Sequence, residues 1–417
     1  MARPRSTFWL LSLAMGASTV GQSMLATSVP LFAVALGLAP LWVGVLVALP
    51  NALPVVLAMT AGRWIDRGGA GRWLAFGTGG MASAPLLLVL VPSAPALALA
   101  QLLLGVFQLF AALSSQSFVA DLGGGRALER NYATYATLLS AGRLVGPLLA
   151  GVAIDAAGFR ATFGVAASVA LFTFSVAWRI RGAVGGPNTE PDGPVVEVDG
   201  EDRAPAVEED AGRPSGAEVR RFGAREALAN VGVQLAVLSS AGVFVAISVR
   251  QAFLPVALTE LGYPATTIGA LISLGALAAV AVRPLMPVIS RILGGPARTL
   301  VVAMLAVAIG VGALGMVTSL AAFALLGVLA GFGTGVGLPL SIVTVASHVA
   351  ARHRGTALGL RLSLNRAAQL AMPVAVGAVI GVAGFGLGFG LAGALLVGLA
   401  VTAATRVAAF ERRAPPG

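Results

Sequence analysis

Long apolar runs alternate with short polar breaks along almost the whole chain. Each run is long enough to cross the roughly 30 Å hydrocarbon core of a bilayer as a helix. The pattern therefore predicts an all-α membrane protein with twelve transmembrane helices, six on each side of a longer central break. A sliding window places these runs near residues 8–36, 41–61, 73–92, 95–120, 132–157, 160–179, 228–259, 264–289, 299–317, 319–349, 355–382 and 385–408.

The central break has a different composition. It is rich in Gly, Pro, Asp and Glu and holds few large apolar residues, so it cannot bury enough surface to offset the entropy of ordering it. We predict a six-helix half at residues 1–181, an acidic flexible cytoplasmic linker at 182–227 and a second six-helix half at 228–417. A regulatory or partner-binding role for the linker is the alternative.

Composition supports a membrane protein and removes several functional classes. The chain is 57% hydrophobic and only 11% charged, a balance that a soluble domain of this size does not show. It has no cysteine, which excludes thiolate catalysis and disulfides, and its two histidines are too few for a metal site. We therefore predict no metal and no cofactor. The net charge of +10 comes from arginines in loops between spans, so we predict no nucleic-acid partner.

The arginines also predict the orientation. They fall in alternate loops, with Arg160 as the exception on the other side. By the positive-inside rule both termini are then cytoplasmic, in a multi-pass protein of a prokaryotic cell (cytoplasmic) membrane. The arginines on the predicted cytoplasmic side are Arg63, Arg67, Arg72, Arg126, Arg130, Arg179, Arg181, Arg220, Arg221, Arg225, Arg291, Arg298, Arg352, Arg354, Arg406, Arg412 and Arg413.

The two halves repeat one another. Gly262 and Gly269 follow Gly37 and Gly44 at one constant offset. Parallel repeats of six helices put a substrate site between the halves, near the middle of the membrane.

The loop after the second run carries a recognisable motif, Gly62-Arg-Trp-Ile-Asp66-Arg67-Gly68-Gly69-Ala-Gly71-Arg72. It resembles the loop signature of the major facilitator superfamily, although Arg72 comes about two residues later than the family pattern. The resemblance implies a conformational latch in which opposite charges hold one state closed. A basic turn that serves topology alone is the alternative. The residues assigned to the latch are Gly62, Asp66, Arg67, Arg72 and a second charge pair, Asp121 and Arg130.

The fifth run carries a second motif, with Gly142, Gly146, Pro147 and Gly151 in a kinked helix. It resembles the fifth-helix signature of the proton-coupled drug exporters in that superfamily, and these four residues would shape the interface that rocks. The resemblance implies efflux with protons as the coupling ion. Gln101 stands where those exporters carry an arginine, and no run has a carboxylate near its centre, which weakens proton coupling.

Arginines near mid-span are the candidate chemistry, because a charge in hydrocarbon is costly unless it faces protein or water. We predict a substrate cavity in which they attract an anionic or strongly polar group. Bonding to carbonyls freed near Pro147 and Pro373 is the structural alternative. Arg283 and Arg361 lie nearer the cytoplasmic side, where snorkelling to the interface is an equal possibility. The predicted cavity residues are Arg143, Arg366, Arg250, Gln22, Gln251 and Asn365.

These observations predict a secondary transporter that moves a small organic solute by alternating access, as an efflux protein with proton coupling. The alternatives are a carrier for an anionic metabolite or sugar acid, and a non-transporting membrane sensor. No metalloprotease or nucleophile-elbow motif is present, so we predict no catalytic residues and no enzyme. The expected partners are a small-molecule substrate, the lipid bilayer and protons, with the protein acting as a monomer.

Overall fold

The computed structural model describes residues 4–121, 125–184, 229–349 and 354–411, and within these ranges the chain is helical with no strand. The predicted linker at 182–227 lies almost entirely outside the described residues. The domain boundaries drawn around it therefore stay predictions.

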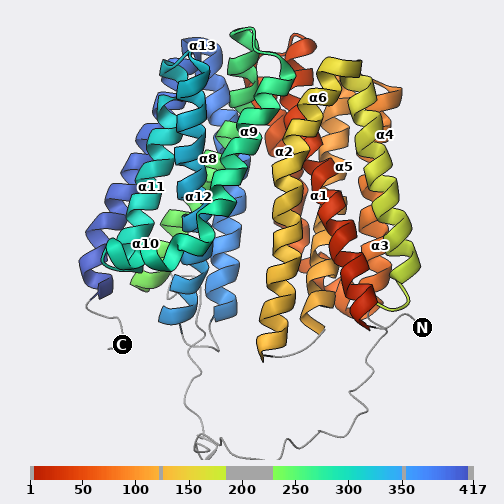
Figure 1. Cartoon of the computed structure of the whole chain (residues 1–417), viewed down its shortest axis with the longest axis horizontal. Helices are drawn as coiled ribbons and strands as arrows, with labels where there is room; N and C mark the ends of the chain where they lie inside the picture. Colours follow the sequence, from red (N-terminus) through yellow and green to blue (C-terminus); the bar gives the residue numbers. More distant parts are fainter. Residues whose placement is uncertain (1–3, 122–124, 185–228, 350–353, 412–417) are drawn as a thin grey trace, which may run out of the picture.

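The helices form two groups that stand side by side (Figure 1). The first half of the chain supplies α1 (Pro4–Ala35), α2 (Pro40–Gly68), α3 (Ala70–Met81), α4 (Ser83–Leu90), α5 (Ala94–Asp121) and α6 (Gly125–Ile180). The second half supplies α8 (Val231–Glu260), α9 (Ala265–Ala281), η1 (Arg283–Leu285), α10 (Met286–Ile292), α11 (Pro296–Gly312), η2 (Ala313–Met316), α12 (Leu320–His348) and α13 (Arg354–Glu411).

Two of these helices are too long to cross a membrane once. The apolar parts of α6 and α13 each contain 51 residues, which would extend about 76 Å at the rise of an α-helix, against roughly 30 Å of hydrocarbon. Each helix contains one glycine with a positive φ, Gly158 (φ 78°, ψ 177°) and Gly384 (φ 78°, ψ 173°). Only glycine adopts this conformation readily. Each glycine marks a kink that joins two helices, and α6 and α13 each turn back on themselves (Figure 1).

By length and composition, nine segments of the described chain can span a membrane, and α1 is not among them. If α6 and α13 each cross twice and α1 crosses once, the number becomes the twelve expected from the hydrophobic pattern. That count, and the cytoplasmic placement of the termini, stay predictions.

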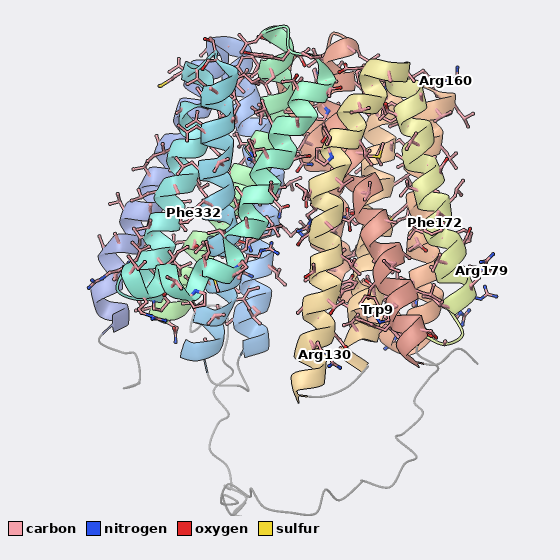
Figure 2. The ribbon with its side chains drawn as sticks, viewed as in Figure 1. Trp9, Arg130, Arg160, Phe172, Arg179 and Phe332 are labelled. Carbon is pink, nitrogen blue, oxygen red and sulfur yellow. The ribbon has the colours of Figure 1, made fainter. Side chains whose placement is uncertain are left out.

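The bundle has two distinct ends, which we name from the chain. The terminal end is where α1 begins and α13 ends, and the far end is where α6 and α13 turn back (Figure 1). Arg130 and Arg179 lie toward the terminal end, whereas Arg160 lies at the far end (Figure 2). Arg160 donates from Nε to the Val89 carbonyl at 3.0 Å, so the one arginine that departs from the loop pattern is anchored on a neighbouring helix end.

Packing joins the two groups through a small set of helices. Within the first half α6 packs mainly on α1, and within the second α13 packs mainly on α8. Across the halves the closest pairs are α6 with α9 and α2 with α13. The apolar core continues across this boundary, because one cluster of buried side chains contains residues of both halves, such as Val29 and Phe253.

Candidate substrate site between the halves

Glycines bring the backbones of the two halves into direct contact at two equivalent crossings. A side-chain carbon on Gly269 of α9 would collide with the Pro147 carbonyl of α6, and one on Gly151 would collide with the Ala265 carbonyl. The absence of side chains lets the helices approach this closely. The second crossing repeats the first between α2 and α13, with Gly44 against the Pro373 carbonyl and Gly377 against the Pro40 carbonyl.

Both crossings lie near the far end, because they involve the first turns of α2 and α9. We call the parts of α6 before and after Gly158 its first and second arms. The residues of the fifth-run motif lie in the first arm and contact two different helices. Pro147 and Gly151 face α9, whereas Gly142 and Gly146 pack on α1, where added carbons would meet the Gly16 and Val20 carbonyls. The fifth-helix motif therefore lies between a neighbour in its own half and one in the other half. Its role in rocking the halves stays a prediction.

A carboxylate joins the halves just beyond the first crossing. Asp155 of α6 accepts a hydrogen bond from the backbone nitrogen of Ala265 at 3.1 Å and another from that of Thr266 at 2.7 Å. These are the first two residues of α9, and the preceding residue, Pro264, makes no side-chain cap. Asp155 thus supplies from one half the helix cap that the other half lacks.

Polar contacts cross the boundary two helical turns from the crossings, toward the terminal end. Arg366 of α13 donates from Nη1 to Asn51 Oδ1 of α2 at 2.6 Å, and Arg283 of η1 donates from Nη1 to Ser140 Oγ of α6 at 3.1 Å. Ser140 and Arg366 stand at the same distance before Pro147 and Pro373. Equivalent positions of the repeat therefore hold an acceptor on one side and a cation on the other.

Arg143 lies on the inward face of α6. Its side chain is exposed. Nine residues rotate an α-helix by two and a half turns, so Val152, nine residues after Arg143, lies on the opposite face. Val152 is 45% exposed. Val145 and Leu149 share that outer face and are 42% and 43% exposed, as expected for contact with lipid. Arg143 is within electrostatic range of Arg283. Its exposure is therefore to the space between the halves.

The contacts that the structure describes for the other predicted cavity residues lie within single halves. Gln22 is half-buried and donates to Ser18 Oγ at 3.2 Å, beside a cavity of about 10 Å³ inside the first half. The Arg250 guanidinium lies against Gly275, inside the second half. Gln251 is half-buried on α8, and Asn365 is buried against Ser240 of α8. Their part in a substrate cavity stays a prediction.

At the level of Arg366, the side-chain hydrogen bonds across the boundary include three residues that were not among the predicted cavity residues: Asn51, Ser140 and Arg283. Asn51 carried a readable signal, because it is a lone amide between Pro50 and Pro54 in an apolar run. Arg283 reaches Ser140 instead of snorkelling, and so it is a third arginine at the boundary beside Arg143 and Arg366. Arg361 does not snorkel either, since only 4% of it is exposed.

The two acids of the predicted latch are Asp66 and Asp121, and their side chains lie outside the described part of the structure. The side chain of His348 and the whole of His353 also lie outside the described residues. Arg67, Arg72 and Arg130 are exposed, and Gly62 has open space where a side chain would stand. The latch stays a prediction.

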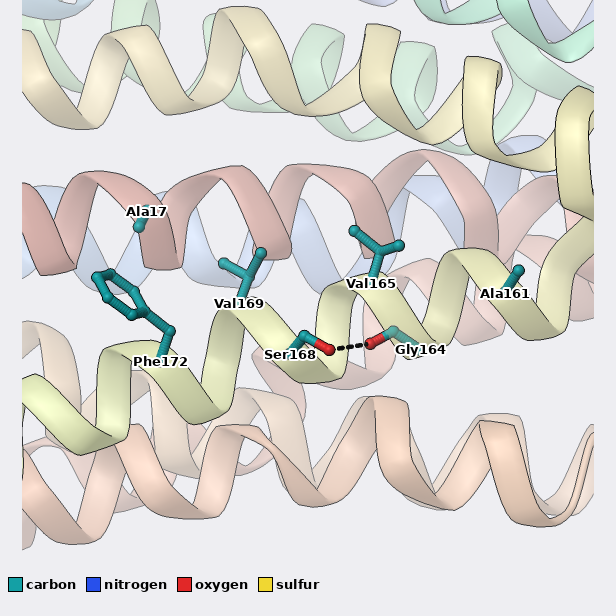
Figure 3. Close-up of a pocket in the computed structure, with 7 residues that line it drawn as sticks. All are labelled: Ala17, Ala161, Gly164, Val165, Ser168, Val169 and Phe172. Atoms are coloured by element: carbon teal, nitrogen blue, oxygen red, sulfur yellow. Dashed lines mark hydrogen bonds between the residues drawn. The ribbon is translucent and has the colours of Figure 1, made fainter.

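One pocket on the described surface lies away from the boundary between the halves. A groove of about 590 Å³ runs between α1 and the second arm of α6 (Figure 3). Its one hydroxyl group, Ser168 Oγ, donates to the Gly164 carbonyl of the same helix at 3.0 Å. With no charged residue in its lining it does not suit a polar solute. The lining residues are Ala17, Ala161, Gly164, Val165, Ser168, Val169 and Phe172.

Comparison with known proteins identifies the architecture. The family model described as Major Facilitator Superfamily matches residues 11–295 and 236–417. A bacterial homologue of the human lysosomal transporter Spinster, in an inward-facing and occupied conformation, superposes with a TM-score of 0.74 at 14% identity, over 99% of this chain and 98% of its own. No curated protein matches the chain.

Two further solved structures share the fold. The peptide transporter POT in complex with sulfate has a TM-score of 0.75 at 14% identity, over 98% of this chain and 96% of its own. A point mutant of the nucleoside transporter NupG has a TM-score of 0.70 at 13% identity, over 97% of this chain and 99% of its own. At these identities the likeness concerns the fold alone.

Proposed function

The chain belongs to the Major Facilitator Superfamily and is a membrane transporter, and from this premise we propose that its cargo is a small organic solute with an anionic group. The family and the similar structures are transporters and not enzymes. We also propose which residues bind this solute and in which direction it is transported.

The main support for an anionic solute is the set of arginines between the halves. Arg143 of the first half lies within electrostatic range of Arg283 of the second, and Arg366 reaches the boundary from α13. Like charges near one another repel, and the repulsion is relieved when an anion binds between them. In the described residues, Asp155 is the one carboxylate that bonds across the halves, and it lies near the far end. A substrate anion therefore fits the charge that the protein leaves unbalanced.

Alternating access follows from where the halves are joined. The glycine crossings and the Asp155 cap close the far end, so the solute would enter this state from the terminal end. If the two halves rock relative to one another about the arginines at the boundary, these contacts break and the far end opens. If the termini are cytoplasmic, as the arginine pattern predicts, this state faces inward.

Efflux across the cytoplasmic membrane, by a protein acting as a monomer, is the direction we propose, and the likeness of 142–151 to drug exporters supports it. Proton antiport has weaker support. Gln101, at the position where those exporters carry an arginine, is buried and donates to the Leu46 carbonyl at 3.1 Å. Its amide does not titrate, so Gln101 joins α5 to α2 by a hydrogen bond and does not carry a proton. Exchange or uptake of an anionic metabolite is the second candidate, and the arginine set favours it.

Transport assays in proteoliposomes test the proposal. We expect counterflow of a mixture of carboxylated and phosphorylated solutes to exceed that of cationic dyes. Arg143→Gln and Arg366→Gln should each raise the KM for the transported anion about tenfold, because each removes a charge-assisted contact worth about 1.4 kcal/mol. An uncoupler distinguishes proton antiport from exchange, because only the former loses its flux.

The matched control is Arg179→Gln, which removes an exposed arginine at the end of α6, away from the boundary. Its KM should equal that of the wild type. Cationic solutes transported with unchanged KM in Arg143→Gln and Arg366→Gln would contradict the anion proposal while leaving the transporter assignment in place.

A further inference from the structure

A second group of polar residues is buried entirely within the second half, and we call it the Arg361 cluster. It lies where α8, α12 and α13 meet, and it is separate from the boundary between the halves. Arg361 is 4% exposed and Asn365 1%, and the serines are fully buried. Its members are Ser239 and Ser240 of α8, Ser341 of α12, and Arg361 and Asn365 of α13.

Arg361 has one hydrogen bond to a neutral group. It donates from Nη2 to Ser341 Oγ at 2.7 Å. Ser341 uses its own proton for the Leu338 carbonyl, also at 2.7 Å, so it accepts from Arg361 without contributing negative charge. The Arg361 Nε proton is buried and has no partner.

Asn365 leaves a second donor unused. Its Oδ1 accepts from Ser240 Oγ at 3.0 Å, whereas its Nδ2 is buried without a partner. Residues four apart share one face of a helix, and side chains lean toward its N-terminus. The amide of Asn365 therefore lies over the turn that carries Arg361.

Ser239 adds a third group. Its hydroxyl is buried without a partner, and it lies 3.5 Å from where a side-chain carbon on Gly337 would stand. Gly337 is one helical turn before Ser341, which binds Arg361. The unused hydroxyl thus belongs to the same junction of three helices.

Donors exceed acceptors in this cluster, and one donor carries a full charge. Buried polar groups are almost always paired, and a buried cation without a counter-charge costs several kcal/mol. The buried polar residues of the described chain include no Asp or Glu. Within the described residues the cluster therefore lacks both an acceptor and a counter-charge.

We propose that the Arg361 cluster binds a small monovalent inorganic anion, chloride being the probe, between Arg361 Nε, Asn365 Nδ2 and the Ser239 hydroxyl. This site is distinct from the inter-half arginines, because Arg366 points to Asn51 of α2. It does not rest on the proposed cargo. A protein that carried no anionic solute would still need this ion to hold α8, α12 and α13 together.

Thermal unfolding of the purified full chain in detergent tests the site. Sodium chloride should raise the midpoint by about 3 °C over sodium gluconate at equal ionic strength, once chloride exceeds its dissociation constant about a hundredfold. Bromide and nitrate should act like chloride, and sulfate like gluconate. Arg361→Gln should abolish the chloride-dependent shift. Arg291→Gln, which removes an exposed arginine of α10, should keep it.

A second variant decides the matter if Arg361→Gln does not fold. Asn365→Asp keeps the shape of the side chain and places a carboxylate beside Arg361, so it should be as stable in gluconate as the wild type is in chloride, and insensitive to chloride. No chloride-dependent shift in the wild type, or an undiminished shift in Asn365→Asp, overturns the proposal and leaves water as the occupant.

Discussion

Asp155 and Thr266 belong to opposite halves of the chain and are joined by a hydrogen bond of 2.7 Å from the Thr266 backbone nitrogen to Asp155 Oδ2. The same carboxylate accepts from Ala265, so it meets the positive end of the α9 dipole. Among the described residues the equivalent crossing has no such cap, because Gly381 stands where Asp155 stands in the first half and has no side chain to accept the bonds. Only the crossing between α6 and α9 is therefore stabilised by a carboxylate, that of Asp155, among the described residues.

Asp155→Asn should shift the population toward a state that is open at the far end. The amide is neutral, so the interaction with the helix dipole is lost. At an exposed site this amounts to about 0.5–1 kcal/mol, or a two- to fivefold change in the ratio of states. Because the chain has no native cysteine, spin labels on Leu36→Cys and Leu261→Cys report the far-end distance directly.

Glu260→Gln is the matched control, since Glu260 is another exposed acid at the far end and its side chain takes no part in joining the halves. Its distance distribution should coincide with that of the labelled parent. An Asp155→Asn distribution indistinguishable from the parent would show that the cap does not hold the far end closed.

Asn51→Asp should weaken binding of the anionic solute. The new carboxylate would take the place of the amide oxygen that accepts from Arg366 at 2.6 Å and would neutralise that arginine as an anion ligand. We expect the KM for the transported anion to rise about tenfold. Asn51→Ala removes the hydrogen bond without adding charge, so its KM should change by less than about threefold. Equal effects of the two substitutions would assign Asn51 a packing role.

The hydrophobic pattern was sufficient for the fold, and the fold is confirmed by the family match and the helical architecture. Gly44 and Gly269 were visible as a repeat and Gly151 as part of the motif in the fifth run, and together with Gly377 they form the two crossings. This part was predictable because a backbone contact in a membrane requires a missing side chain, and glycine is recognisable in any sequence.

Side-chain direction was not predictable to the same degree. Arg366 and Arg361 lie five residues apart in one helix, yet one faces α2 and the other α12. Moving a residue by one or two positions along a helix changes the face on which its side chain lies, from the boundary between the halves to the interior of one half. Depth along a span is readable from a hydropathy window, whereas the face depends on which helices surround it. For that reason Arg361 was expected near the interface and Asn51 was overlooked.

Gly158→Ala should destabilise the protein through the backbone. Its φ of 78° and ψ of 177° lie in a region that is essentially restricted to glycine, at a cost of about 1–3 kcal/mol for other residues. The midpoint of thermal unfolding should fall by about 1–3 °C. Gly164→Ala lies in the same arm, in regular helix with open space around it, and should leave the midpoint unchanged or raise it slightly. A fall of the same size in both variants would argue against a special turn at Gly158.

Gly269→Ala should prevent the far end from closing. The added carbon would collide with the Pro147 carbonyl, and because this neighbour is backbone it cannot rotate away. The halves must then separate near Pro147, so the far-end spin labels should report longer distances, and the transport rate should fall more than about tenfold. Gly381→Ala is the control, because a carbon there meets nothing within 4 Å. If Gly269→Ala transported at the wild-type rate with unchanged distances, this crossing would not be the contact that alternating access makes and breaks.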